Sequence, residues 1–249
     1  MDEVARRLAE RWGFVPTEEL PKGYCSRVYA DATRALKVPW QGEEMESGCR
    51  AALTLSGWLG PTVYEHNPET GSLLMERIMP GTNLFEAGLS DAEAMEAVAA
   101  MVPLLRNAPT EGCMPLSEYY ESGDPLFERL LTTTREECFL HGDLHHFNLL
   151  RSGARWVPID PKGLLGDPAY ECVAFMRNPL DALPFGEELE QTLRNRIAWF
   201  ADHLDLDPWR IAAWTLVDRR EDQEPGVDHP WDRLRLALEA IVPEFGPAD

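Results

Sequence analysis

A run of polar residues enclosed by two apolar segments constrains this 249-residue chain more than any other stretch. The run 141–148 reads HGDLHHFN and lies between Phe139-Leu140 and Leu149-Leu150. Apolar pairs of this kind predict short buried strands, so the polar run is predicted to be a loop held at both ends. Polar groups confined this closely are costly to bury unless other groups satisfy them. A purely structural loop is therefore a disfavoured alternative.

The residue types in this loop favour phosphoryl transfer. Asp143 can accept a proton from a hydroxyl nucleophile. Asn148, in the same loop, and Asp160, in the segment WVPIDPKG at 156–163, supply hard oxygen ligands. Mg²⁺ bound to a nucleoside triphosphate prefers such ligands. The pattern H-x-D-x-x-x-x-N with a later Asp thus predicts a magnesium-dependent kinase.

Two other metal chemistries are alternatives to this interpretation. A zinc site is one, but the histidines and the five cysteines lack the paired spacing that zinc favours. The tetrapeptide 142–145 also resembles one corner of a two-metal phosphoesterase, which needs several more His and Asp ligands. Outside the loop only His66, His203 and His229 remain, and none lies in a metal motif.

Charge and composition narrow the possible partners. The net charge of −20 argues against nucleic acid or an anionic membrane as the main partner, and it would suit a cationic substrate. An acidic surface that serves solubility alone has equal weight. No apolar run is long enough to span a membrane, and the N-terminus lacks a secretory pattern, so we expect a cytoplasmic protein. Scattered cysteines fit reduced thiols.

The first part of the chain predicts a small nucleotide-binding lobe. After a helix over 3–12, β-prone runs flank residues 23–26, which predicts a hairpin tip whose N–H groups and Ser26 hydroxyl close over phosphates. Lys37 lies between two apolar residues and is predicted to hold the α- and β-phosphates. An exposed edge-strand lysine is the alternative.

A helix over 43–58 is expected to present a carboxylate to this lysine. Glu43, Glu44 and Glu46 are all candidates, and Glu46 lies closest to the helix interior. Strands then follow over 61–64 and 72–78, and Met79-Pro80-Gly81 ends the pattern. We therefore divide the chain into lobes at 1–78 and 79–249.

The connector between these lobes is predicted to read the adenine edge through backbone groups of Glu76, Arg77 and Ile78. Beyond it the pattern is helical. A capping box at Ser90–Glu93 starts a helix that Pro103 should kink or end. Asp167 is predicted to cap a helix over 169–176, a role as well supported as any catalytic one. Further helices are expected over 126–131, 187–204, 208–219 and 231–241.

These motifs together resemble the aminoglycoside phosphotransferase superfamily, most closely its streptomycin 6-kinase and hydroxyurea-resistance-kinase branch. The resemblance rests on Lys37 and on the segments 74–77, 80–81, 141–148, 159–170 and 177–179. It implies an α+β, bilobal, protein-kinase-like fold. Its N-terminal lobe is small and mainly β with one key helix, and its C-terminal lobe is larger and mainly α.

The resemblance also implies roles for individual residues. Asp143 would be the catalytic base, Asn148 and Asp160 the Mg²⁺ ligands, Lys37 the phosphate clamp, and His141 a brace for the loop. The reaction implied is transfer of the γ-phosphate of ATP, or of GTP, to a hydroxyl of a cationic aminoglycoside-type antibiotic, which would inactivate it. A kinase for another small alcohol or amine, or a nucleotide-binding regulator without catalysis, are the alternatives.

The sequence departs from the family pattern at two positions. Phe147 stands where glycine is common, and Cys49 stands where the glutamate of the first-lobe helix is usual, which leaves Glu46 about one turn early. The acceptor is predicted to bind beside Asp143, between the central loop and C-terminal helices rich in acidic residues, among them Asp218 and Glu221.

Overall fold

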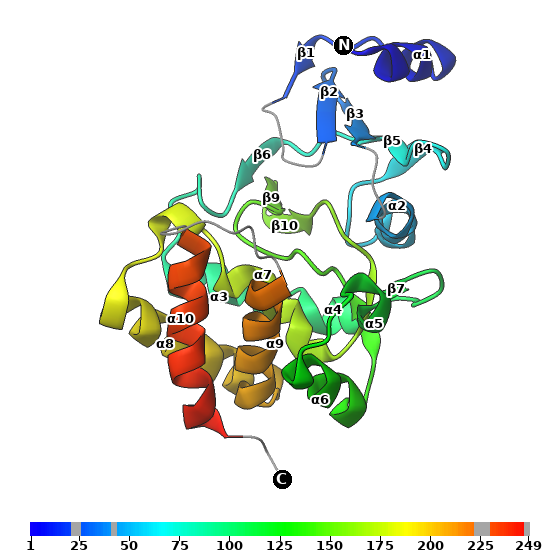
Figure 1. The fold of residues 1–249 in the computed structure, drawn as a ribbon. Coiled ribbons are helices and arrows are strands. Elements are labelled where there is room, and N and C mark those ends of the chain that lie inside the picture. Colours follow the sequence, from blue (N-terminus) through cyan, green and yellow to red (C-terminus); the bar gives the residue numbers. More distant parts are fainter. Residues whose placement is uncertain (21–25, 41–43, 222–229, 247–249) are drawn as a thin grey trace.

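The structure is a computed structural model that describes residues 1–20, 26–40, 44–221 and 230–246. A five-stranded sheet with two helices lies at one end of the molecule, and a larger group of helices lies at the other (Figure 1). Strands β9, Leu149–Ser152, and β10, Arg155–Pro158, lie between these two parts. This is the α+β, two-lobed architecture that the sequence predicts.

The N-terminal sheet is antiparallel and has the order β1-β2-β3-β5-β4. Its strands are β1 Glu18–Glu19, β2 Ser26–Ala30, β3 Arg34–Pro39, β4 Val63–Asn67 and β5 Ser72–Glu76. Helix α1, Glu3–Arg11, begins at Asp2, whose side chain accepts from the N–H of Ala5. Its buried face packs with Tyr29, Leu36 and Leu74 in a small core. The apolar alternation of β3 thus fixes which face of the sheet is covered.

Helix α2, Glu44–Leu55, docks on the loop that carries Asp160. The approach is close enough to require glycine on both sides. A Cβ atom on Gly163 would lie 2.6 Å from the carbonyl oxygen of Ser47, and one on Gly48 would lie 3.0 Å from that of Pro161. Gly163 also has a φ of 69°, in the region that favours glycine.

Two three-stranded sheets hold the central loop. One has the order β10-β9-β6, with β6 Pro80–Asn83, β9 Leu149–Ser152 and β10 Arg155–Pro158. The other has the order β7-β11-β8, with β7 Met114–Pro115, β8 Cys138–Leu140 and β11 Leu164–Gly166. The loop runs from β8 to β9, and Phe139, Leu140 and Leu149 are fully buried. The predicted apolar anchors are therefore real strands.

The C-terminal part is mainly helical. Its core contains Trp214 of α9, which is fully buried. Ser90 and Glu93 form the predicted capping box of α3, which ends at Ala99, and Pro103 lies in the first turn of the separate helix α4. The helices are α3 Asp91–Ala99, α4 Val102–Arg106, α5 Leu116–Tyr119, α6 Pro125–Thr133, η1 Pro168–Cys172, α7 Val173–Met176, η2 Leu180–Ala182, α8 Gly186–Leu204, α9 Pro208–Glu221 and α10 Pro230–Phe245.

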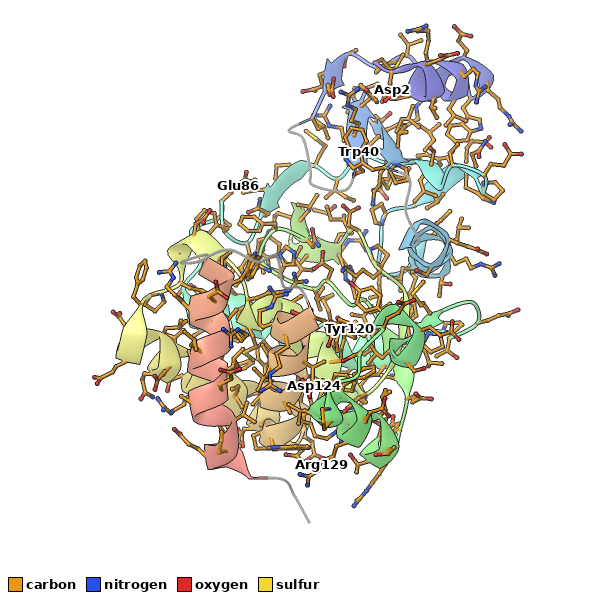
Figure 2. All side chains as sticks on the ribbon, viewed as in Figure 1. Asp2, Trp40, Glu86, Tyr120, Asp124 and Arg129 are labelled. Atoms are coloured by element: carbon orange, nitrogen blue, oxygen red, sulfur yellow. The ribbon has the colours of Figure 1, made fainter. Side chains whose placement is uncertain are left out.

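Side chains fill the space between these elements (Figure 2). None of the helices in the described residues is long and apolar enough to cross a membrane.

Candidate active site

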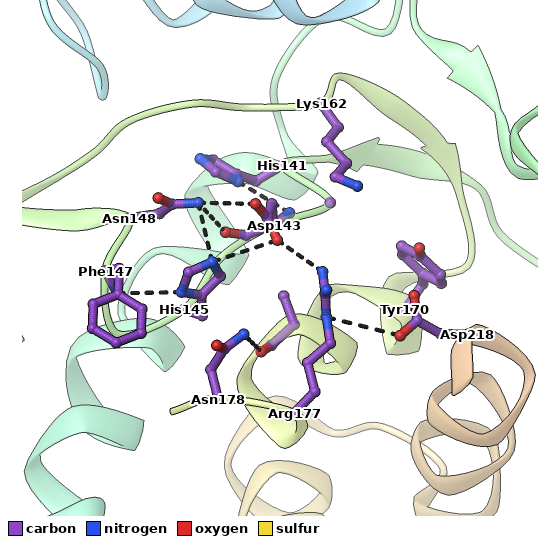
Figure 3. Close-up of polar contacts among 12 residues, drawn as sticks. His141, Asp143, His145, Phe147, Asn148, Lys162, Tyr170, Arg177, Asn178 and Asp218 are labelled. Carbon is purple, nitrogen blue, oxygen red and sulfur yellow. Dashed lines mark hydrogen bonds and ion pairs between the residues drawn. The ribbon is translucent and has the colours of Figure 1, made fainter. Parts of the chain in front are cut away.

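Asp143 lies at the centre of a polar network in the loop between β8 and β9 (Figure 3). Its Oδ1 accepts from Nη2 of Arg177 at 2.8 Å and lies 3.5 Å from Nε2 of His145. Its Oδ2 accepts from Nδ2 of Asn148 at 3.1 Å. About a quarter of the Asp143 side chain (24%) is exposed, so the carboxylate remains accessible to a substrate.

The charge state of Asp143 follows from these neighbours. Burial alone would raise its pKa, but the contact with His145 and the charges of Arg177 and Lys162 hold the pKa well below its usual range. The carboxylate is therefore ionised throughout the neutral pH range. It can orient a hydroxyl group and receive its proton as the bond to phosphorus forms.

A buried glutamate that sequence reasoning missed braces the start of the loop. The carboxylate of Glu171, in η1, accepts from the N–H of His141 at 2.7 Å and from that of Gly142 at 3.2 Å. Burial raises the pKa of Glu171 to about 7, although these two hydrogen bonds act in the opposite direction. The only signal in the sequence was a lone acidic residue inside an otherwise apolar segment, 169–176.

His141 is fully buried and turns back onto the loop. Its Nδ1 accepts from the N–H of Asp143 at 3.3 Å. Burial lowers the pKa of His141 to about 4, so the ring is neutral and can act as this acceptor. These contacts support the predicted bracing role of His141.

The structure brings the two predicted metal ligands together. The N–H of Ile159 donates to the carbonyl of Asn148 at 2.9 Å, and the N–H of Lys162 donates to that of His141 at 2.7 Å. The segment with Asp160 is therefore bonded to the catalytic loop at two points. An amide oxygen and a carboxylate, completed by phosphate oxygens and water, form a donor set that fits Mg²⁺.

Lys37 points from a central strand toward this segment. Strand β3 lies between β2 and β5, so the alternative of an exposed edge-strand lysine is wrong. The ammonium nitrogen lies 2.5 Å from Oδ1 of Asp160. The predicted phosphate clamp and one predicted metal ligand are thus in direct contact.

The expected pair between Glu46 and Lys37 is not formed. Glu46 is exposed and pairs with Arg50 one turn later on α2, with 2.9 Å between Oε1 and Nη2. The position of α2 that faces the cleft belongs to Cys49, which is buried and whose thiol interacts electrostatically with Lys37. Around the helix axis, Cys49 and Arg50 lie on opposite sides of Glu46, and Glu46 turns toward Arg50. Glu43 and the side chain of Glu44 lie outside the described residues.

Two backbone N–H groups of the connector already have hydrogen-bond partners within the N-terminal lobe. The N–H of Glu76 donates to the carbonyl of Thr62 at 2.7 Å, and that of Arg77 donates to Thr33 at 2.8 Å. The Arg77 side chain binds Glu18 at 2.8 Å. These two N–H groups therefore cannot read an adenine edge as predicted. For Ile78 the adenine contact stays a prediction.

Two further predicted site residues, Ser26 and Asp167, make contacts that belong to the fold. Ser26 is buried at the start of β2 and pairs with Pro39, whereas residues 23–25 of the predicted hairpin tip lie outside the described part of the chain. Asp167 caps η1 as predicted, and its carboxylate accepts from Ala169, Arg210 and Trp214. The bonds of Asp167 to α9 make it a structural residue of the C-terminal lobe.

A cavity of about 530 Å³ is lined by Arg177, the residue that binds Asp143. Arg177 lines it and links it to the catalytic loop, because its guanidinium group binds Asp143 and lies 3.8 Å from Asp218. Burial would lower the pKa of Arg177, but the two carboxylates raise it. Four acidic residues line the cavity, and its walls are Met114, Glu118, Tyr119, Tyr120, Glu121, Lys162, Arg177, Asp218, Arg219 and Glu221.

Only part of this cavity could be predicted from the sequence. Asp218 and Glu221 were among the predicted acidic residues, whereas Glu118 and Glu121 come from a short stretch that showed no pattern. Asp218 is held by the hydroxyl of Tyr120 at 2.7 Å, which in turn lies 2.7 Å from that of Tyr170. This buried network fixes the inner wall.

Arg196 of α8 binds the backbone on both sides of Arg177. Nη1 of Arg196 donates to the carbonyls of Phe175 and Asn178, both at 2.9 Å. Its other nitrogens bind Asp91 at 2.6 and 3.1 Å. Arg196 is almost fully buried, so these bonds replace water as its partners.

Comparison with known proteins agrees with this site. Residues 116–221 match the family described as aminoglycoside/hydroxyurea antibiotic resistance kinase. The chain is also 32% identical to a streptomycin 3''-kinase of Klebsiella pneumoniae, over 84% of this chain and 86% of that protein. The chain belongs to this kinase family. It is 27% identical to a streptomycin 6-kinase of Streptomyces griseus, over 86% of this chain and 79% of the relative.

The structural comparison confirms the protein-kinase-like fold. A thermostable mutant of the aminoglycoside phosphotransferase APH(4)-Ia, in a ternary complex with ADP and hygromycin B, superimposes with a TM-score of 0.60. The match covers all of both chains at 14% identity, so it concerns the fold alone. Together with the family assignment, it makes this member of the kinase family an enzyme of the phosphotransferase class with an alcohol group as acceptor.

Proposed function

We propose that this kinase transfers the γ-phosphate of ATP to a hydroxyl group of a cationic aminoglycoside-type antibiotic and thereby inactivates it. The observation that carries the proposal is the position of Asp143. It is an accessible, ionised carboxylate, and Arg177 connects it directly to a cavity lined by four acidic residues.

Phosphoryl transfer requires alignment and charge neutralisation more than covalent catalysis, because its transition state is loose. Asp143 orients the acceptor hydroxyl and takes its proton. Lys37 holds the nonbridging phosphate oxygens and, as the ion pair with Asp160 indicates, reaches the same place as the metal ligands. Mg²⁺, held by Asn148 and Asp160, would neutralise charge on the phosphates.

Charge supports a cationic acceptor. The acidic side chains Glu118, Glu121 and Glu221 line the cavity and are suited to ammonium or guanidinium groups. The chain as a whole carries a net charge of −20, which attracts cations from solution. Within this proposal the enzyme works in the cytoplasm, where thiols stay reduced. The described cysteines, Cys49, Cys113, Cys138 and Cys172, are free.

The test is ³¹P NMR of the purified protein with Mg-ATP and a panel of aminoglycosides, with hydroxyurea included because the family description names it. We expect a new phosphomonoester signal with at least one aminoglycoside. Asp143→Asn keeps the shape of the side chain and should lower turnover by roughly 10²- to 10⁴-fold. Nucleotide affinity should change little.

Two outcomes would reject the proposal. If hydroxyurea or another small alcohol consumes ATP while no aminoglycoside does, the acceptor class is wrong. If Mg-ATP binds but no compound is phosphorylated, the nucleotide-binding regulator becomes the better account.

A further inference from the structure

Two exposed aromatic rings lie next to each other beside the catalytic loop. Phe85 is 50% exposed and Phe147 is 39% exposed, although neither is needed to fill the core. Their ring centroids are 5.6 Å apart and the ring planes are inclined at 55°. We call these two rings the aromatic platform. Half-exposed phenylalanines offer apolar area that gains free energy when a ligand covers it.

The platform is held in place by backbone pairing. Phe85 follows β6 and Phe147 precedes β9, and these two strands are antiparallel neighbours. Between the strands and the rings, the N–H of Leu84 donates to the carbonyl of His146 at 3.0 Å. The two rings are therefore presented by a paired backbone and not by two independent loops.

One imidazole connects the platform to the catalytic carboxylate. The ring of His145 meets the ring of Phe147 edge to face, with centroids 5.7 Å apart. The N–H of Phe147 donates to Nδ1 of the same imidazole at 3.2 Å, and its Nε2 lies 3.5 Å from Oδ1 of Asp143. The platform thus begins one side chain away from the site of proton transfer.

The platform and the acidic cavity lie on different sides of Asp143. Figure 3 shows His145 and Phe147 on one side of this carboxylate and Arg177 with Asp218 on the other. An acceptor with a single ring can occupy one of these sides. An acceptor with several rings, whose hydroxyl lies at Asp143, extends to both.

We propose that Phe85 and Phe147 bind a second, amino-substituted ring of the acceptor, while the ring carrying the other cationic groups occupies the acidic cavity. This inference rests on the proposed function. The negative faces of the two aromatic rings attract an ammonium group within about 6 Å, and their apolar area covers the carbon skeleton of the sugar or cyclitol. The platform therefore sets a preference for multi-ring acceptors.

The experiment compares two acceptors across a set of variants. The acceptors are a multi-ring aminoglycoside that the wild-type protein phosphorylates and a single-ring fragment with the same hydroxyl. The variants are Phe85→Ala, Phe147→Ala and Phe147→Trp. The matched control is Phe185→Ala, because Phe185 is also an exposed phenylalanine of the same lobe, at 67% exposure. The guanidinium carbon of Arg233 lies 3.8 Å from the centre of its ring. Thermal melting reports whether each variant is folded.

We expect the KM for the multi-ring acceptor to rise roughly threefold to tenfold in each alanine variant, which is the loss of one cation–π contact. The KM ratio between fragment and multi-ring acceptor should shrink by the same factor. Phe147→Trp should preserve that ratio, and Phe185→Ala should leave both KM values unchanged. The KM for ATP should not follow these changes.

Several results would overturn the proposed role of the platform. One is that the alanine variants raise the KM of both acceptors equally. Another is that kcat falls with no change in the KM ratio, which would mean that Phe147 only shapes the loop. An equal effect of Phe185→Ala would also count against it. These failures are distinct from failure of the proposed function. In that case the wild-type protein itself would phosphorylate no aminoglycoside, and the inference would be rejected with it.

Discussion

Nζ of Lys37 and Oδ1 of Asp160 lie 2.5 Å apart, so the lysine of the N-terminal sheet is paired directly with the carboxylate that follows β10. In this chain the lysine is therefore oriented by the segment that carries Asp160. Among the described side chains of α2, Cys49 interacts electrostatically with the lysine, whereas Glu46 pairs with Arg50. If Asp160 holds Mg²⁺ and Lys37 holds phosphate, as we propose, this pair is expected to loosen in the nucleotide complex, because each partner would then have a new counterion.

This arrangement predicts different effects for two charged residues of the N-terminal lobe. Lys37→Met should raise the KM for ATP by tenfold or more, because the phosphates lose a charge-assisted contact. Glu46→Gln should change it by less than about twofold, since an exposed i,i+4 pair contributes only about 0.3–0.5 kcal/mol. Steady-state kinetics with varied ATP tests both. A large effect of Glu46→Gln would show that this carboxylate moves to Lys37 in the nucleotide complex.

Arg177 is expected to control the protonation of Asp143. Its positive charge is one of the causes that hold the pKa of Asp143 low, so Arg177→Gln should raise that pKa. The carboxylate is active when ionised, and the acid limb of the pH profile of kcat/KM should therefore move to higher pH. Arg194→Gln is the control, because Arg194 pairs with Glu190 and Glu244 on the surface. An unshifted acid limb in Arg177→Gln would contradict this.

Removal of Arg196 should destabilise the fold strongly. Arg196→Met leaves three carbonyl groups and Asp91 without their buried partner. Each buried acceptor left without a donor costs about 1–3 kcal/mol, whereas the ion pair itself contributes less because 43% of the Asp91 side chain is exposed. Chemical denaturation should show this loss, whereas Arg194→Met on the same helix should cost less than about 1 kcal/mol. Equal losses in the two variants would mean that the buried network carries no special weight.

Glu171 should give the protein a measurable pH dependence of stability. Its pKa in the folded chain, about 7, is raised above the ordinary value of 4.5 by burial. The contribution of this group is therefore fully present below pH 4.5 and is lost as the pH rises through 7. The difference in unfolding free energy between wild type and Glu171→Gln should decrease over this range, by up to about 1.4 kcal/mol per pH unit.

The control for this measurement is Glu187→Gln, which removes an exposed carboxylate from the first turn of α8. Its difference from wild type should be flat over the same pH range. A flat difference for Glu171→Gln as well would mean that the two N–H donors keep the carboxylate ionised when folded.

The parts of the site that depend only on residues close together in the chain could be predicted from the sequence. The loop 141–148 needs only its flanking apolar strands, and the capping box at Ser90 needs only a residue three positions later. Contacts between distant segments could not be read in this way. Glu171 reaches back thirty residues to His141, and only the tertiary fold brings them together. The helical period of α2 is clear from the sequence, but the side that faces Lys37 is not, because it depends on how the helix packs in the lobe.

The contact of α2 with the metal-ligand loop has a consequence for control of the enzyme. Protein kinases are commonly switched by moving the corresponding helix toward or away from the catalytic centre. Here Gly48 and Gly163 let the two backbones approach closely, with only the small side chain of Ala51 against Gly163, so that the helix and the loop are expected to move as one unit. We expect the lobes to open and close around nucleotide without a separate inactive position of α2. We therefore expect the rate of this enzyme to depend on the concentrations of its two substrates and not on a separate activation step.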